Sequence, residues 1–226
     1  MTAVIFIGSA VISYLLGSIP TGFLWGKACG IDIRQVGSGN IGATNVMRAL
    51  GKGPGIAVLV LDVAKGFLPV FFAPKLFAFF QLGGDEETVH HFNAILQIVC
   101  CLCVIAGHNW TCWLKFRGGK GIATSTGALL AFLPWPLLSA LCVWLIVFAL
   151  SRYVSLASIC AAAGLPIATW LIEKNPFLVG FTTLLGLVAI YKHKSNIQRL
   201  IAGTENRIGR KGRSTTGSVA PPQARA

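Results

Sequence analysis

Charged side chains are scarce in this chain. Asp, Glu, Lys and Arg make up only 12% of its 226 residues, whereas hydrophobic residues make up 54%. Soluble domains contain roughly 25% charged residues, and the mean hydropathy of +0.72 points the same way. This composition excludes an ordinary soluble domain. The sequence instead predicts a polytopic membrane protein, which we expect to be all-α.

The cysteine positions do not predict a disulfide framework, and the N-terminal residues do not predict a cleavable signal peptide. The seven cysteines are odd in number, and most lie inside apolar runs, where a thiol packs like a small hydrophobic side chain. No lysine or arginine precedes Lys27, so the first apolar run lacks the basic region with which a signal peptide begins. We therefore expect residues 3–25 to remain as the first span.

Apolar segments recur along the rest of the chain and predict about seven transmembrane helices, some of them short. They fall at residues 3–25, 55–80, 88–106, 122–133, 137–150, 154–172 and 177–191. Three are shorter than the roughly 20 residues of a full span. Residues 122–150 could accordingly form two spans or a re-entrant hairpin, and either version returns the chain to the same side of the membrane.

The distribution of cations predicts the orientation. When the spans alternate, 16 of the 19 lysines and arginines fall on one side, which the positive-inside rule makes cytoplasmic. The N-terminus is then outside and the C-terminus cytoplasmic. The net charge of +12 reflects this topology, so no nucleic-acid partner is needed. We expect one integral-membrane domain over residues 1–211 and a flexible tail over 212–226, which has too little apolar surface to fold.

Three stretches on the predicted cytoplasmic side share one composition. Residues 36–48, 107–126 and 191–213 each combine glycine, a small hydroxyl or amide side chain, and lysine or arginine. Such loops supply what a phosphate group needs, namely close backbone donors, hydroxyls and a fixed cation. Positive-inside charge alone would explain the cations of one loop. It would not explain the glycines around Lys120, which let backbone N–H groups converge on an anion.

Nucleotide, cofactor and metal sites are not predicted. Gly37, Gly39 and Gly42 match GxGxxG, but they follow a membrane helix and not the strand of a βαβ unit. Gly119 and Lys120 resemble the end of a P-loop, yet Gly121 replaces the hydroxyl residue that would hold magnesium. The carboxylates and histidines form no ligand cluster, so we expect a site without metal.

Three motifs carry a family resemblance. GSGNIGATNVMR, GHNW followed by FRGGKGIATS, and HKSNIQRLIAGTENRIGRK resemble the cytoplasmic motifs of the bacterial acyl-phosphate:glycerol-3-phosphate 1-acyltransferase family (PlsY-type). The resemblance covers essentially residues 1–211. One departure is Thr111, where many members have proline, and we expect it to alter only a turn.

The resemblance implies an activity and a location. The protein would transfer a fatty acyl group from acyl phosphate to the 1-hydroxyl of sn-glycerol 3-phosphate, giving lysophosphatidic acid and inorganic phosphate, the first acylation of phospholipid synthesis. It would need no cofactor and would act as a monomer in the bacterial cytoplasmic (inner) membrane. Its partners would be the two substrates and the lipid bilayer, with the active site on the cytoplasmic face.

Candidate site residues follow from the motifs. The expected catalytic residues are Ser38, Arg48, Lys120, Ser155, His193 and Asn196. The expected substrate-binding and phosphate-binding residues are Gly37, Gly39, Asn40, Thr44, Asn45, His108, Gly118, Gly119, Gly121, Thr124, Arg199 and Glu205. Arginine offers a phosphate two parallel hydrogen bonds, and lysine offers it a point charge. The spacing of His193, Asn196 and Arg199 places the three side chains on one side of a helical turn.

Several roles stay open at this level. Ser155 could lie near the reacting carbonyl or cap a helix. The proton acceptor could be His108, His193 or the phosphate of the glycerol substrate. Asp62 and Lys65 could be functional, as intramembrane charges usually are, or could simply pair along a helix. A transporter for phosphorylated metabolites and an intramembrane serine hydrolase at Ser38 are the competing functions.

Overall fold

The computed structural model describes residues 2–79 and 85–209, so the tail predicted for 212–226 lies outside the described residues. The described chain is α-helical with two short 3₁₀ turns, Ile33–Gln35 and Cys112–Leu114, and contains no strand, which confirms the all-α prediction. Its helices are α1 Thr2–Ser18, α2 Thr21–Ala28, α3 Ala43–Leu50, α4 Lys52–Phe79, α5 Glu86–Asn109, α6 Ile122–Phe132, α7 Pro134–Ser151, α8 Val154–Glu173, α9 Pro176–Lys192 and α10 Lys194–Ile201.

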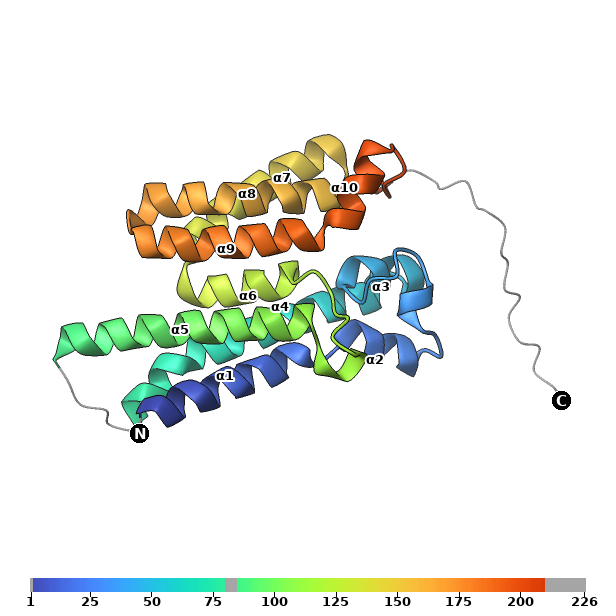
Figure 1. Ribbon diagram of the computed structural model, residues 1–226. Helices are drawn as coiled ribbons and strands as arrows, with labels where there is room; N and C mark the ends of the chain where they lie inside the picture. Colours follow the sequence, from blue (N-terminus) through green and yellow to red (C-terminus); the bar gives the residue numbers. More distant parts are fainter. Residues whose placement is uncertain (1, 80–84, 210–226) are drawn as a thin grey trace.

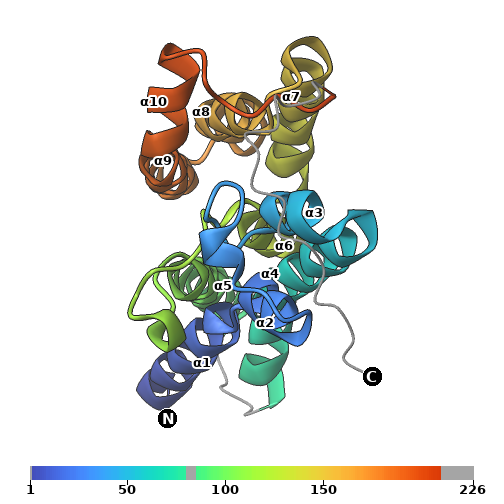
Figure 2. The same cartoon turned by 90° about the vertical axis from the view of Figure 1, so that its right-hand side faces the viewer.

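The helices form two groups that lie side by side (Figures 1 and 2). In the first group α1 packs on α5 and α4 packs on α6, with the short α2 and α3 at one end. In the second group α8 packs between α7 and α9, and α10 continues from α9. The chain passes from one group to the other between α6 and α7, where only Leu133 separates the two helices.

Glycines let the helices of the first group approach closely. A Cβ on Gly17 of α1 or on Gly107 of α5 would overlap the backbone of the facing helix. The same holds for Gly66 of α4 and Gly127 of α6. Small residues at such crossings allow backbone contact between helices in a bilayer, where packing replaces the hydrophobic effect as the driving force. The two helix pairs therefore position the end of α5, where the 110–121 loop begins, and the start of α6, where it ends.

The membrane class is confirmed by the helix lengths. Five segments of the described chain are long and apolar enough to cross a bilayer, and a sixth follows if α9 and α10, which meet at a 58° bend, count as one. Helix α6 has 11 residues, so at 1.5 Å per residue it is about 16 Å long, about half of the hydrocarbon thickness. The number of crossings and the orientation stay predictions.

The first predicted span, residues 3–25, is interrupted toward its C-terminal end. Helix α1 ends at Ser18 and α2 begins after Pro20, which has no backbone N–H to continue the helical ladder. Side chains from other helices and loops bind the carbonyls at this break. Thr111 Oγ1 donates to the Ser18 carbonyl at 2.5 Å, and Lys65 Nζ donates to the Ile19 carbonyl at 2.7 Å.

Residues 122–150 form two separate helices. Lys120 precedes α6 and Ser155 follows α7, and both line the same cavity. The pair therefore runs away from that end of the bundle and back to it, as both versions of the prediction required. The short helix α3 was not predicted. It occupies the C-terminal half of the stretch that was predicted to be the first cytoplasmic loop.

Candidate active site

A cavity of about 510 Å³ lies where the three glycine-containing stretches meet, at the end of the bundle that carries α2, α3 and α10 (Figure 1). All six residues expected to be catalytic line it, and so do six of the expected binding residues: Asn40, Thr44, Asn45, His108, Gly121 and Glu205. Six others lie outside its lining: Gly37, Gly39, Gly118, Gly119, Thr124 and Arg199. Stretches far apart in the sequence thus build one site.

Much of the cavity lining is apolar. The apolar side chains come mainly from α4, α6 and α7, namely Leu59, Val63, Ile122, Leu141, Trp144 and Phe148. A cavity lined by both cations and hydrocarbon suits a ligand with an anionic head and an apolar chain.

The first stretch is held in shape by Asn45. Its buried side-chain amide donates to three carbonyls of the loop, and its Oδ1 accepts from the backbone N–H of Ser38 at 2.8 Å. Gly37 and Gly39 adopt the left-handed region, with φ of 62° and 70°, where a side chain would be strained. The Asn45 amide group and the two glycines therefore shape the loop, while Ser38 and Arg48 line the cavity.

The second stretch packs against the end of α5. The Gly118 N–H donates to the Asn109 carbonyl at 3.2 Å, and the Gly119 N–H donates to the His108 carbonyl at 3.0 Å. These two amides are thus engaged and do not provide the anion-binding donors expected of them. The glycines serve packing instead, because a Cβ on Gly119 would overlap the His108 imidazole. The close approach places the side chain of Lys120 in the cavity wall.

Lys120 carries a perturbed ammonium group. Its Nζ donates a hydrogen bond to Oδ1 of Asn196 on α10. Burial lowers the pKa of Lys120 to about 8, the charge of Glu205 acts in the opposite direction, and the neighbouring cations Arg199, Arg48 and Lys192 lower it further. Several positive charges therefore surround one partly buried position, which is the electrostatic condition for binding an anion there.

Glu205 connects the third stretch to α8. Its carboxylate accepts hydrogen bonds from Ser155 Oγ at 3.0 Å, Asn196 Nδ2 at 2.8 Å and Arg199 Nε at 2.7 Å. Burial raises the pKa of Glu205, but the bonds from Asn196 and Arg199 outweigh it and leave the pKa below its usual value. The N-cap position of α8 is Tyr153, which makes no side-chain capping hydrogen bond, and Ser155 lies inside the helix, so the helix-cap explanation for Ser155 is wrong. Arg199 itself does not line the cavity and contacts Glu205, which does.

The two candidate histidines differ in their surroundings. His193 lies between α9 and α10, and its Nδ1 is 2.8 Å from the Ala189 carbonyl oxygen. A carbonyl can only accept, so we assign the proton of the neutral ring to Nδ1, which leaves Nε2 as an acceptor. His108 Nδ1 is instead 3.7 Å from Asp62 Oδ1 and makes no hydrogen bond in the described structure.

Asp62 and Lys65 form a buried ion pair on α4 that also contacts residues outside this helix. Their side chains are 2.8 Å apart along α4, in the i, i+3 relation that the sequence suggested. Thr21 Oγ1 donates to the same Asp62 oxygen at 2.6 Å, and Lys65 also binds the carbonyl of Ile19. The pair therefore ties α4 to the break between α1 and α2, and Asp62 lines the cavity.

Some lining residues were not singled out from the sequence. Trp144 stands in an uninterrupted apolar run of α7, where no sequence pattern distinguishes it from lipid-facing neighbours.

Thr124 was expected to bind substrate but does not line the cavity. Its side chain is fully buried on α6, and its carbonyl lies where a Cβ of Gly66 on α4 would be, so it packs two helices together.

These features define an integral membrane protein of all-helical fold with a cationic pocket at one end of its bundle. A family model described as glycerol-3-phosphate acyltransferase matches residues 7–203. The chain belongs to the glycerol-3-phosphate acyltransferase family.

Named relatives and solved structures agree. The glycerol-3-phosphate acyltransferase of Desulforamulus reducens is 49% identical and covers 93% of this chain and 96% of its own. That of Geobacter sulfurreducens is 44% identical, covering 87% and 94%. The crystal structure of PlsY (YgiH), an integral membrane glycerol 3-phosphate acyltransferase, matches in its glycerol 3-phosphate form with a TM-score of 0.79 and 37% identity, over 90% of this chain and 96% of that one. Its lysophosphatidic acid form matches with a TM-score of 0.76 and 36% identity, over 90% and 95%.

Proposed function

We propose that this protein transfers a fatty acyl group from acyl phosphate to the 1-hydroxyl of sn-glycerol 3-phosphate, giving lysophosphatidic acid and inorganic phosphate. The observation that carries the proposal is the cavity that Arg48 and Lys120 line together with many apolar side chains. The matched PlsY structures support it, because one is described as a glycerol 3-phosphate form and the other as a lysophosphatidic acid form.

The reaction asks little covalent chemistry of the protein. Acyl phosphate is a mixed anhydride and is already activated, so the hydroxyl oxygen can attack its carbonyl carbon directly. The bond from that carbon to the phosphate oxygen breaks, and inorganic phosphate leaves with the electron pair. The protein has to position two phosphate groups, stabilise the oxyanion and provide for one proton.

Side chains in the cavity can be given these tasks. Arg48 and Lys120 bind the phosphate groups, as a bidentate donor and a point charge, and the hydroxyl groups of Ser38 and Thr44 add hydrogen bonds. Asn196 positions the Lys120 ammonium through their hydrogen bond. Ser155 and Glu205 hold α10 in place beside the reacting groups.

The hydroxyl proton has two candidate acceptors. His193 Nε2 has a free lone pair when the ring is neutral, because Nδ1 donates to the Ala189 carbonyl. The phosphate of glycerol 3-phosphate is the second acceptor and travels with the substrate. His108 is less suited, because its Nδ1 faces Asp62 in the interior.

The proposed setting is the bacterial cytoplasmic membrane, with the protein acting as a monomer, without metal or cofactor, and with its site facing the cytoplasm. Acyl chains dissolve in the bilayer and glycerol 3-phosphate dissolves in the cytosol. A cavity at one end of the helices, lined by both polar and apolar side chains, can receive both. A transporter would need its site near the bilayer midplane, which the end position of this cavity does not favour.

The decisive experiment compares acyl donors. The purified protein is given glycerol 3-phosphate with acyl phosphate, with acyl-CoA or with acyl carrier protein thioester, and lysophosphatidic acid and free phosphate are measured. We expect product from acyl phosphate in equal amounts of lipid and phosphate. Product from thioesters alone would show that the donor is wrong, and uptake of glycerol 3-phosphate into liposomes without acylation would favour a transporter.

A pair of variants tests the site in the same assay. Lys120→Met keeps the length of the side chain and removes the charge, so we expect kcat/KM to fall by a factor of about 10² or more, as when a transition-state donor is lost. Lys115→Met is the matched control, because Lys115 is an exposed cation of the same loop and does not line the cavity. Equal activity of the two variants would remove Lys120 from the site.

A further inference from the structure

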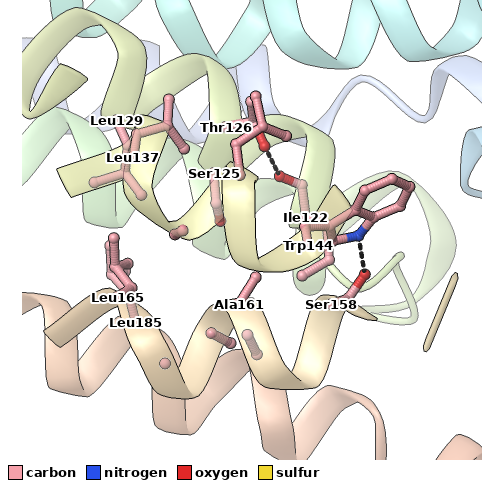
Figure 3. A pocket seen from close by; sticks show the side chains of 15 residues that line it. Ile122, Ser125, Thr126, Leu129, Leu137, Trp144, Ser158, Ala161, Leu165 and Leu185 are labelled. Atoms are coloured by element: carbon pink, nitrogen blue, oxygen red, sulfur yellow. Dashed lines mark hydrogen bonds between the residues drawn. The ribbon is translucent and has the colours of Figure 1, made fainter. Parts of the chain in front are cut away.

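A second cavity, of about 80 Å³, lies between α6 and the second helix group (Figure 3). It adjoins the 510 Å³ cavity of the candidate active site, because five residues line both: Ile122, Thr126, Leu141, Trp144 and Ser158. These side chains separate the two spaces, and Trp144 is the largest of them.

Most of the polar side chains that line this second cavity are hydrogen-bonded to each other or to backbone carbonyls. The Trp144 indole N–H donates to Ser158 Oγ at 3.1 Å, and Ser158 Oγ donates to the Val154 carbonyl at 2.8 Å. Thr126 Oγ1 donates to the Ile122 carbonyl at 2.9 Å within its own helix. With these groups engaged, the cavity presents mostly hydrocarbon. It therefore suits an alkyl chain and not a phosphate or sugar.

We propose that this cavity holds the distal methylene groups of the acyl chain, and that Trp144, held by Ser158, controls entry to it and so sets the chain-length preference. The inference rests on the proposed function, because it takes a fatty acyl group as the ligand of the adjoining cavity. The two cavities adjoin each other and share five wall residues, and this adjacency is the observation that supports placing the chain there.

The dimensions fit a limited number of methylene groups. About 10–15 Å³ of such space accommodates one water, so 80 Å³ has room for roughly five to eight groups of that size. The width depends on small residues, Ala161 and Ala162 on α8 and Gly186 and Ala189 on α9. Leucines from α6 to α9 close the apolar end, namely Leu129, Leu137, Leu165 and Leu185 (Figure 3).

Filling the cavity tests the inference. Ala161→Leu places a larger side chain in the space, and Ala163→Leu makes the same change at an exposed position of α8 outside both cavities. Purified variants receive acyl donors of about eight to about eighteen carbons, and kcat/KM is measured for each. Burying one methylene contributes about fourfold in binding, from about 0.8 kcal/mol. Displacing two should therefore lower kcat/KM for the longest donors by about 15-fold.

The expected pattern is specific to chain length. Ala161→Leu should leave the shortest donors and the KM for glycerol 3-phosphate unchanged, whereas Ala163→Leu should leave the whole series unchanged. An equal loss at every chain length, or no loss at all, overturns the proposal. The second result would mean that a bilayer lipid or nothing occupies the cavity and that the acyl chain leaves by another path.

A second pair of variants addresses Trp144. Ser158→Ala removes the acceptor of the indole N–H, and Trp144→Phe removes the donor and narrows the side chain. If Trp144 controls entry, both should flatten the dependence of kcat/KM on chain length in the same direction. Unchanged profiles in both would assign the preference elsewhere. If the wild-type protein fails to acylate glycerol 3-phosphate with every donor in the series, the proposed function itself is refuted. The chain-length profiles of the variants cannot produce that result.

Discussion

Lys120 donates a hydrogen bond from its side-chain amino group to the side-chain oxygen of Asn196. The first residue precedes α6 in one helix group and the second lies on α10 in the other, so the bond links the two groups at the cavity that both residues line. Its acceptor is a neutral amide and not a carboxylate. The ammonium is therefore held in place without a direct ion pair, and its charge stays available for a phosphate group.

Replacing the neutral acceptor with a charged one tests this relationship. The new carboxylate of Asn196→Asp would pair directly with Lys120. It would also lie beside the carboxylate of Glu205, which is now 2.8 Å from Asn196 Nδ2. The Lys120 ammonium would then bind the new carboxylate in place of the substrate phosphate, and a hydrogen bond to a charged group contributes about 1.5–3 kcal/mol. We therefore expect Asn196→Asp to raise the KM for glycerol 3-phosphate or the donor by about tenfold or more. Asn196→Ala should affect KM less than kcat. Similar KM values in Asn196→Asp and wild type would contradict the arrangement.

The pH dependence should report Lys120. A phosphate ligand needs the protonated ammonium, and the pKa of Lys120 is lowered to about 8 in the free protein, chiefly by burial. As the pH rises through about 8, the charge is lost, so kcat/KM should fall on the alkaline side. Glu205, whose pKa lies below its usual value, stays ionised there. The measurement is a kcat/KM profile from pH 6 to 10.

The control for that profile is Lys120→Arg. A guanidinium stays protonated throughout this range, so any residual activity should lose the alkaline decline near pH 8. A decline at the same pH in Lys120→Arg would assign the titration to another group, such as the substrate or a second side chain.

Sequence patterns predicted the membrane class, most helix positions and the residues around the cavity. Apolar runs and glycine-containing motifs are local signals, and the roles of Arg48 and Lys120 as cavity-lining cations follow from residue type and topology together. The break at Pro20 was missed because apolar residues continue on both sides of it. Its stability depends on Thr111 and Lys65, which bind the freed carbonyls from distant parts of the chain.

Other features depend on contacts that no local pattern contains. The amides of Gly118 and Gly119 resembled an anion-binding loop, but their use is decided by the end of α5 that packs against them. Asn45 resembled a ligand, and its amide group holds the first loop in shape. Trp144 became recognisable only when α7 and α8 brought it beside Ser158.

His193 provides a test of the proton acceptor. If Nε2 accepts the hydroxyl proton, His193→Asn should lower kcat by about 10²- to 10⁴-fold, the usual range for a general base, with a small change in KM. Asparagine retains an amide donor in place of Nδ1. The comparison variant is His108→Asn, which should affect stability more than kcat, because His108 packs against Gly119. A near-normal kcat in His193→Asn would transfer the role to the phosphate of the substrate.

The buried pair of Asp62 and Lys65 should matter first for stability. Asp62→Asn leaves the Lys65 ammonium without its counterion inside a membrane helix, and removing one partner of a buried ion pair usually costs about 3–5 kcal/mol. We expect a clearly lower unfolding temperature of the detergent-solubilised protein, followed by tryptophan fluorescence. Asp62→Asn combined with Lys65→Met should recover much of the loss, because no unpaired charge remains. Lys75→Met, at an exposed position of α4, should leave the unfolding temperature unchanged. If the double variant unfolds as early as Asp62→Asn, the pair acts through Thr21 and the break after α1, and the charge of Lys65 is not the cause.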